Sequence, residues 1–211
     1  MTGGAGFIGS HVADAFVERG AEVLVVDDFS TGSRDYVPKQ AKLAELDIAD
    51  ADRVQEAFAD FAPEFICHLA AQASVTVSVK EPKRDFDSNV LGTFNILNSA
   101  TEHRARTVFA STGGALYGEG APIPTDESYV AQPLSPYGAS KQAAEAFVGA
   151  LARFHGIDHA VLRLGNVYGP RQSPHGEAGV VAIFSERLLL GRPVVAYGHG
   201  TPTRDYVHVG D

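Results

Sequence analysis

The sequence contains little of what marks several classes of protein. Its 211 residues include one cysteine, Cys67, so no internal disulfide can form, and we expect a reducing, cytoplasmic setting. No apolar run reaches the roughly 18 residues of a membrane-spanning helix, so we expect no membrane association. Residues 1–9 carry no positive charge, which is not typical of a signal peptide.

Positive charge is also scarce. The 17 Lys and Arg residues are outnumbered by 26 Asp and Glu, which gives a net charge of −9. Because a nucleic-acid-binding surface neutralises phosphates with Lys and Arg, we expect no nucleic-acid partner. In contrast, 45% of the residues are hydrophobic and 20% are charged, which is typical of a chain that folds around a core.

Short runs rich in β-branched residues alternate with longer segments of helical length. The runs predict strands at residues 22–27, 42–46, 65–69, 107–111 and 160–164. The longer segments predict helices at residues 9–19, 51–61, 84–103 and 136–155. Strands that alternate with helices indicate βαβ units, so the prediction is an α/β fold with a doubly wound parallel sheet of Rossmann type.

The pattern changes after Leu164. A loop rich in Gly and Pro (169–176) precedes a predicted helix at 180–190 and predicted strands at 194–197 and 205–209. We therefore predict one domain at residues 1–165 and the start of a smaller lobe at residues 166–211. Both ends of the chain are expected to be truncated.

A glycine-rich segment opens the chain. Gly3, Gly6 and Gly9 are spaced G-x-x-G-x-x-G, and Gly4, Gly6 and Gly9 are spaced G-x-G-x-x-G. Glycine is needed where backbone turns tightly and approaches a pyrophosphate, and a helix that begins near Phe7 directs its free amides at that phosphate. Only Met1 and Thr2 precede this loop, whereas a buried strand normally does.

An acidic residue completes this motif. Asp27 ends a predicted strand 18 residues after Gly9. A carboxylate in this place accepts hydrogen bonds from the adenosine ribose and repels a 2′-phosphate, which favours NAD over NADP. The two features together predict a dinucleotide-binding site.

A tyrosine and a lysine define a second candidate site. Tyr137 and Lys141 are four positions apart on the predicted helix 136–155, and hence on one face. Ser135 suits an N-cap, and Gly156 suits the position after the last turn. An ammonium beside a phenol lowers the phenol's pKa, so a phenolate can act as a general base near neutral pH.

The same helix carries an apolar stripe at helical spacing. We expect this stripe to face the core, with the tyrosine and lysine away from it. Its members are Ala139, Ala143, Ala146, Phe147, Ala150, Leu151 and Phe154.

These motifs, taken in order, resemble those of a known family. The chain is similar to the extended short-chain dehydrogenases/reductases, within them to NAD-dependent sugar-nucleotide epimerases and dehydratases, and most of all to UDP-glucose 4-epimerases. The segments that carry the resemblance are 2–11, 27–32, 46–48, 68–72, 89–93, 111–118, 137–141, 166–171 and 204–209.

The resemblance implies how NAD would be bound. The glycine loop and the start of its helix would hold the pyrophosphate, the segment after the acidic residue would wrap the adenosine ribose, and two residues would border the adenine. The implied cofactor residues are Gly3, Gly6, Phe7, Ile8, Gly9, Asp27, Asp28, Phe29, Ser30, Thr31, Gly32, Asp47, Ile48, Leu69, Ala70, Ala71, Asn89, Ser111, Tyr137 and Lys141.

The resemblance also implies the catalytic and substrate-binding residues. Tyr137 would be the base, and Lys141 would hold the nicotinamide ribose and tune the phenol. Ser111 or Thr112 would hydrogen-bond the sugar O4, and we expect Thr112 to do so. Asn166 and Arg204 would contact the nucleotide diphosphate of a UDP-sugar.

The implied reaction is 4-epimerisation, which interconverts UDP-glucose and UDP-galactose through a 4-keto sugar. Related dehydratases place an acidic pair after the catalytic Thr, and here those positions hold Gly113 and Gly114. Dehydration is therefore disfavoured, and decarboxylation of UDP-glucuronate is the alternative within the family. An NAD-binding sensor without activity and an inactive fragment are alternatives of another class. The resemblance also implies a homodimer, formed through helices 84–103 and 136–155.

No metal site is expected. His155 and His159 have a spacing that occurs in metal sites, but Gly156 and Asp158 interrupt the helix between them. We therefore interpret this segment as the end of a helix. His68 is interpreted as a structural residue at the end of a buried strand.

Overall fold

The computed structural model describes residues 1–175, 179–196 and 200–211, and it confirms the α/β class. Strands β1 (Leu24–Asp27) and β2 (Lys42–Glu45) pair in parallel, as do β3 (Phe65–His68), β4 (Arg106–Thr112) and β5 (His159–Leu164). Thr2 bridges the two groups, because it pairs with Val26 of β1 and with His68 of β3. The sheet order is therefore β2-β1-β3-β4-β5, with residue 2 between β1 and β3.

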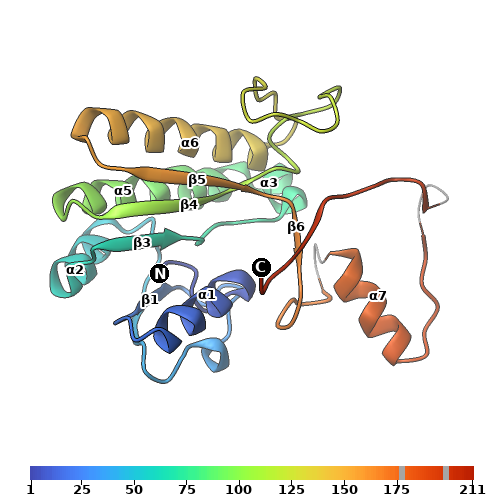
Figure 1. Ribbon diagram of the computed structural model, residues 1–211, viewed down its shortest axis with the longest axis horizontal. Coiled ribbons are helices and arrows are strands. Elements are labelled where there is room, and N and C mark those ends of the chain that lie inside the picture. Colours follow the sequence, from blue (N-terminus) through green and yellow to red (C-terminus); the bar gives the residue numbers. More distant parts are fainter. Residues whose placement is uncertain (176–178, 197–199) are drawn as a thin grey trace.

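Helices cover both faces of this sheet (Figure 1). Successive residues of β1 point to opposite faces, as strand geometry requires. Val25 packs in a cluster with Ala13 of helix α1 (Phe7–Glu18). Val26 packs in another cluster with Val54 of α2 (Ala51–Phe61) and Ile96 of α5 (Gly92–Glu102).

The helical region that precedes β4 is more divided than the sequence predicts. In place of one helix over 84–103, α4 (Pro82–Phe86) leads through a π-helical turn, η2 (Asp87–Leu91), into α5. A further short helix, α3 (Val75–Lys80), lies where no element is predicted. π-Turns inside helices are often found at functional sites, and this one carries Asn89.

Helix α6 (Pro136–His155) begins and ends where predicted. Ser135 Oγ accepts a hydrogen bond from the Gly138 amide at 3.1 Å, and Gly156 ends the helix with a φ of 63°. The predicted core-facing stripe is wrong: its Ala139, Ala146, Phe147, Ala150 and Phe154 are exposed.

The buried face of α6 consists instead of Gly138, Ser140, Lys141, Ala144 and Val148. The apolar pattern misplaces the face because small and polar residues pack against the sheet in this helix. As a result Lys141, which was expected to lie away from the core-facing side, is directed into the molecule.

The last part of the chain forms a small parallel pair of strands and one helix. Strand β6 (Asn166–Tyr168), which is not predicted, pairs with β7 (Tyr206–His208), which lies within the predicted strand 205–209. Helix α7 (Val180–Leu189) is confirmed and lies apart from the sheet (Figure 1). Residues 194–196 are not a strand, which contradicts the prediction for 194–197, and residue 197 lies outside the described residues, as does residue 176 of the predicted loop.

The loop after β6 docks on helix α1. Arg171 forms an ion pair with Asp14 at 2.7 Å, and His11 Nε2 hydrogen-bonds the Pro170 carbonyl at 2.9 Å. Among the helices of the described ranges, none is long and apolar enough to cross a bilayer.

Candidate active site

The glycine loop is packed so closely that it has no room for side chains. A Cβ on Gly3, whose φ is +68°, would lie 2.6 Å from the Ala70 amide nitrogen, and a Cβ on Gly9 would lie 2.0 Å from the Gly3 carbonyl oxygen. Gly6 is the N-cap residue of α1 and supplies no side-chain cap. The first amides of α1 are therefore left for an anion, and the structure brings the loop against residues 69–70 as predicted.

Asp27 lies at the end of β1 beside this loop. Its carboxylate is 8% exposed and accepts hydrogen bonds from the amides of Ala5 and Phe29, both at 2.9 Å. The Phe29 residue turns the chain with a φ of 57°, and Ser33 donates its amide to the Ala5 carbonyl at 2.9 Å. The segment 28–32 thus folds back onto the glycine loop, which places the predicted ribose-binding residues beside the predicted phosphate-binding ones.

The predicted adenine-bordering residues have different surroundings. Asp47 is exposed, and its carboxylate accepts a hydrogen bond from the Ala49 amide at 2.8 Å. The Ile48 side chain is buried in the core beneath Gly92, where a Cβ would lie 2.6 Å from it. Ile48 therefore supports helix α5 as well as the edge of the predicted cofactor groove.

Lys141 is the most buried charged group of the predicted site. It is 3% exposed, its Nζ donates to the Ala110 carbonyl at 2.9 Å, and it lies 4.7 Å from the centre of the Phe109 ring. Burial lowers the pKa of Lys141 to about 8, while the negative charges of Asp85 and Glu145 act in the opposite direction. The ammonium therefore keeps its charge at neutral pH.

Tyr137 is half-buried in the first turn of α6, one turn before this lysine. The lysine is anchored to β4, whose last residues are Ser111 and Thr112. The structure therefore brings the predicted base, its cationic neighbour and the end of β4 to one place.

The two candidates for the third catalytic residue differ in their surroundings. Thr112 is half-buried, and its Oγ1 accepts a hydrogen bond from the Ala115 amide at 3.2 Å, which leaves its hydroxyl hydrogen to be donated. Ser111 is 5% exposed, and its Oγ has no hydrogen-bond partner among the described residues. Of the two hydroxyls, the one on Thr112 is the more accessible.

A buried polar network connects α6 with the loop after β3. Asn89 donates from Nδ2 to the Gln72 carbonyl at 2.9 Å and to Ser140 Oγ at 3.1 Å, and its Oδ1 accepts from the Gln72 amide at 2.8 Å. Ser140 Oγ in turn donates to the carbonyl of Tyr137 at 2.9 Å. Asn89, predicted to line the cofactor groove, is thus a buried link between that groove and the catalytic helix.

His68 links this network to the glycine loop. Its Nδ1 lies 2.6 Å from Thr2 Oγ1, and its Nε2 lies 2.9 Å from Thr93 Oγ1. Because Thr93 donates its own hydroxyl to the Asn89 carbonyl at 2.6 Å, the His68 Nε2 is the donor to Thr93 and Nδ1 accepts from Thr2. Burial and the positive charge of Lys141 lower the pKa of His68 and keep the ring neutral. The ring is fully buried at the end of β3, in agreement with its interpretation as a structural residue.

His68 makes the free energy of unfolding depend on pH in the acid range. Burial, followed by the positive charge of Lys141, lowers the pKa of His68 to about 3. Between about pH 6.5 and pH 3 the unfolded chain binds a proton here that the folded chain does not, so the free energy of unfolding falls as the pH is lowered through that window. The expected slope from this group is up to about 1.4 kcal/mol per pH unit.

Side-chain NMR of the histidines tests this expectation. His68 should keep the neutral Nε2–H form from pH 7 down to pH 5, while denaturant titrations show a lower stability at pH 5 than at pH 7. A His68 signal that titrates near pH 6.5 in the folded protein would contradict the assignment.

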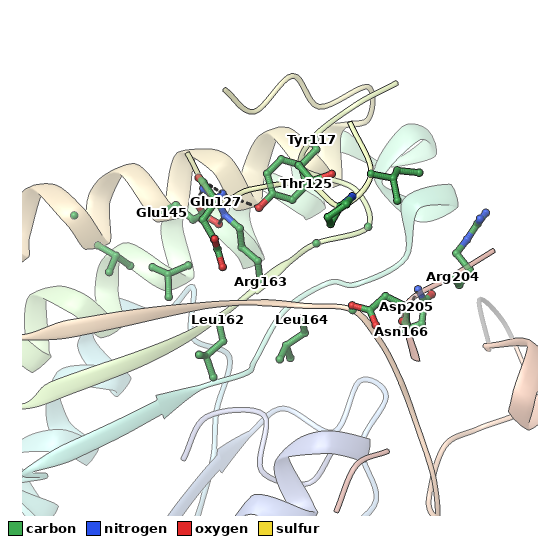
Figure 2. A pocket seen from close by; sticks show the side chains of 18 of the residues that line it. Tyr117, Thr125, Glu127, Glu145, Leu162, Arg163, Leu164, Asn166, Arg204 and Asp205 are labelled. Carbon is green, nitrogen blue, oxygen red and sulfur yellow. Dashed lines mark hydrogen bonds and ion pairs between the residues drawn. The ribbon is translucent and has the colours of Figure 1, made fainter. Parts of the chain in front are cut away.

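A cavity of about 1140 Å³ adjoins the end of β4 but does not include all of the predicted site. Gly113, Gly114, Asn166 and Arg204 line it, whereas Tyr137, Lys141 and Thr112 do not. Asn166 donates its amide to the Asp205 carbonyl at 2.7 Å, which places it beside Arg204 (Figure 2). The predicted diphosphate-binding residues therefore lie together, and they line the same cavity as Gly113 and Gly114, which follow Thr112.

An ion pair that sequence analysis missed forms the other end of this cavity (Figure 2). Arg163 of β5 is bound by both carboxylate oxygens of Glu145, at 2.8 and 3.1 Å, and donates to Tyr117 Oη at 3.0 Å. The hydrogen bonds that Arg163 donates to Glu145 raise the pKa of the guanidinium further. This pair fastens the segment that begins at Tyr117 to helix α6.

The site residues fit a dinucleotide better than a metal ion. The close-packed glycine loop, the uncapped start of α1 and the Asp27 carboxylate are the groups that a pyrophosphate and a ribose require. Among the described residues, no group of three or more His, Cys, Asp or Glu is arranged to hold a metal. His155 ends α6 and His159 begins β5, which confirms the interpretation of that segment as a helix end.

Comparison with known proteins identifies the family. The family model described as the NAD dependent epimerase/dehydratase family matches residues 1–211. A putative UDP-glucose 4-epimerase of Methanocaldococcus jannaschii is 44% identical over 213 residues, which cover 100% of this chain and 69% of that protein. Several other curated relatives are also named UDP-glucose 4-epimerase.

Solved structures agree with this result. The UDP-glucose 4-epimerase of Thermotoga maritima with UDP-glucose is 46% identical with a TM-score of 0.96, over 99% of this chain and 68% of that one. The UDP-glucose 4-epimerase of Thermus thermophilus in complex with NAD is 49% identical with a TM-score of 0.90, over 99% and 70%. From its glycine loop to its last strand, this chain belongs to the NAD-dependent epimerase/dehydratase family.

Proposed function

We propose that this protein is an NAD-dependent nucleotide-sugar 4-epimerase that interconverts UDP-glucose and UDP-galactose through a 4-keto sugar. The observation that carries the proposal is the start of α6. There Tyr137 lies one turn from a buried Lys141 ammonium that is fixed to the end of β4. The relatives named UDP-glucose 4-epimerase, with solved complexes of UDP-glucose and of NAD, support the choice of substrate and cofactor.

The chain's residues would hold the cofactor as follows. The amides at the start of α1, with Gly3, Gly6 and Gly9, would bind the pyrophosphate, and Asp27 would bind the adenosine ribose. Lys141 would hold the nicotinamide ribose. When bound, NAD supplies the acceptor that takes hydrogen with its electron pair from the sugar C4 and returns it.

Three side chains would act on the sugar. Tyr137 Oη removes the proton of the 4-hydroxyl as the C4–H bond breaks, and returns it when that bond is re-formed on the other face. Thr112 hydrogen-bonds the sugar O4 and keeps it in line with the phenol. The Lys141 ammonium stabilises the phenolate, because a nearby positive charge favours the anion.

Asn166 and Arg204 would bind the diphosphate, so most of the binding energy lies in the nucleotide. The sugar is then free to turn between its two encounters with the cofactor. Residues 1–165 would accordingly form the NAD-binding domain, and residues 166–211 would form part of the substrate-binding lobe.

The glycine pair after Thr112 favours epimerisation over dehydration. A Cβ on Gly113 would lie 3.2 Å from the carbonyl oxygens of Arg163 and Leu164, so an acidic side chain there would displace backbone. Gly114 has room for a side chain but carries none. The pair supplies no group that could remove or donate the further proton that dehydration needs.

We also infer a homodimer in the cytoplasm. Phe86 of α4, Phe94 of α5 and Phe147 of α6 are 55%, 40% and 40% exposed, and Phe94 and Phe147 meet edge to face. An apolar surface of this kind is typical of a face that a second subunit covers.

The direct test is incubation of the purified protein with UDP-galactose and NAD, followed by separation of the nucleotide sugars. We expect UDP-glucose to accumulate toward equilibrium without net formation of NADH. A parallel incubation with UDP-glucuronate should release no CO₂. Release of CO₂ in the second incubation without conversion in the first would replace the proposal with decarboxylation. Binding of NAD without either reaction would replace it with a sensor.

A further inference from the structure

Asp85 is a buried acidic residue that the proposed reaction does not yet use. It lies on the short helix α4 and is 1% exposed. Its Oδ1 accepts hydrogen bonds from Gln72 Nε2 at 2.8 Å and from Asn89 Nδ2 at 3.2 Å. Its Oδ2 is enclosed and has no hydrogen-bond partner among the described residues. A buried carboxylate is costly unless a positive charge lies near it.

The charges of the neighbouring residues on this helix are already paired. Lys83 forms an ion pair with Asp87 at 2.5 Å, and Arg84 forms one with Glu81 at 3.6 Å. These four side chains are at the surface, whereas Asp85 is directed inward. The cation that Asp85 faces is therefore not one of its own helix.

Asp85 raises the pKa of the Lys141 ammonium of α6 through its negative charge, without an ion-pair contact. The titratable groups around Lys141 are Tyr137 and Glu145 of α6, His68 of β3 and Asp85 of α4. Glu145 is bound on both oxygens by Arg163, and His68 is neutral. Asp85 is the carboxylate of this group that has no ion pair among the described residues.

Asp85 also reaches the catalytic helix through hydrogen bonds. Its Oδ1 accepts from Gln72, and Asn89 Nδ2 lies within hydrogen-bond distance of both Asp85 Oδ1 and Ser140 Oγ, sharing its two hydrogens among these and the Gln72 carbonyl. Ser140 donates to the carbonyl of Tyr137. Ser140 is the residue immediately before Lys141. One carboxylate is thus tied to the backbone of the predicted base and lies near the charge of its partner.

We propose that Asp85 is a positioning residue, whose buried carboxylate fixes the first turn of α6 through Asn89 and Ser140, the residue before Lys141. Its place in catalysis rests on the proposed function. Its effect on Lys141 does not, because both groups belong to this chain and can be observed without substrate. Asp85 itself touches neither the sugar nor the reacting carbon in this proposal.

The test is an NMR titration of the lysine Nζ groups in protein labelled with ¹³C- and ¹⁵N-lysine. The chain has five lysines (39, 42, 80, 83 and 141), so the signals can be assigned by substitution. In the unaltered protein, Lys141 should titrate near pH 8 and remain charged at pH 7. In Asp85→Asn, which removes the charge but keeps an acceptor oxygen, the midpoint should move to lower pH by about one unit.

Two further variants separate charge from structure. Asp85→Glu keeps the charge and should restore most of the midpoint. Asp87→Asn removes a carboxylate two residues away that faces the surface and Lys83, and it should leave the Lys141 midpoint unchanged. An unchanged midpoint in a folded Asp85→Asn protein would overturn the proposal. If that variant fails to fold, a Lys141 that is already neutral at pH 7 in the unaltered protein would overturn it.

Kinetics provide the second readout. The alkaline limb of the kcat profile should move to lower pH in Asp85→Asn and return in Asp85→Glu, with no matching change in KM for the UDP-sugar. Altered lysine titration in a protein without epimerase activity would contradict the proposed function and leave the assignment of Asp85 standing. An unchanged Lys141 titration in an active epimerase would overturn the assignment of Asp85 and leave the proposed function standing.

Discussion

Replacing Tyr137 with phenylalanine is expected to reduce kcat for UDP-galactose by about 10²- to 10⁴-fold, the usual contribution of a positioned general base. The variant removes one oxygen and keeps the ring, so the first turn of α6 and its Ser135 cap should persist. NAD binding should be retained, because the glycine loop and Asp27 are unchanged. Steady-state kinetics, with NAD affinity measured by thermal shift or calorimetry, check both parts.

Tyr129→Phe is the matched control. It removes a phenol from a half-buried residue whose ring meets that of Tyr117 edge to face, outside the site. Its kcat should equal that of the unaltered protein. A Tyr137→Phe enzyme that turns over as fast as Tyr129→Phe would show that another group removes the proton.

Replacing Gly9 with alanine is expected to destabilise the protein and abolish NAD binding together. The added Cβ would lie 2.0 Å from the Gly3 carbonyl oxygen and 3.0 Å from the Gly4 Cα, so the glycine loop itself must move. We expect a loss of about 3 kcal/mol or more in the free energy of unfolding. For a chain of this size that is a fall of about 6 to 12 °C in Tm.

Gly149→Ala is the matched control: it also adds one methyl group to a glycine, but we expect it to leave Tm unchanged or to raise it. Gly149 lies inside helix α6, and its added Cβ would meet only the flexible end of Arg153, at 3.3 Å. Alanine in a helix interior is favoured over glycine by up to about 1 kcal/mol, so Tm should stay level or rise. If NAD raised Tm by the same amount in Gly9→Ala and Gly149→Ala, the role of the glycine loop in NAD binding would be contradicted.

The order of strands and helices follows from the sequence because its signals are local. β-Branched runs with turns between them predict β1 to β5, and Ser135 and Gly156 set the ends of α6 by their own capping chemistry. The glycine spacing and Asp27 were also readable, since each depends on residues close together in the chain. The structure brings these elements to one edge of the sheet.

What could not be predicted depends on contacts between distant segments. The buried face of α6 is set by the packing of Ala144 with Phe109 of β4 and the close approach of Gly138 to the Ala115 carbonyl, not by the number of apolar residues on a face. The Arg163–Glu145 pair joins residues of different elements, and no local pattern marks it. Asp85 looks like an ordinary surface residue in a charged segment until Gln72 and Asn89 are placed around it.

In the proposed reaction, the hydrogen removed from the sugar C4 is held within the site and returned to the same carbon. Conversion of UDP-galactose carrying deuterium at C4, in ordinary water with NAD, tests it most directly. The account predicts UDP-glucose that retains the deuterium at C4, as read by mass spectrometry and NMR. Product that carries solvent hydrogen at C4 would contradict it, because the proton would then have been removed from carbon rather than from the 4-hydroxyl of the sugar.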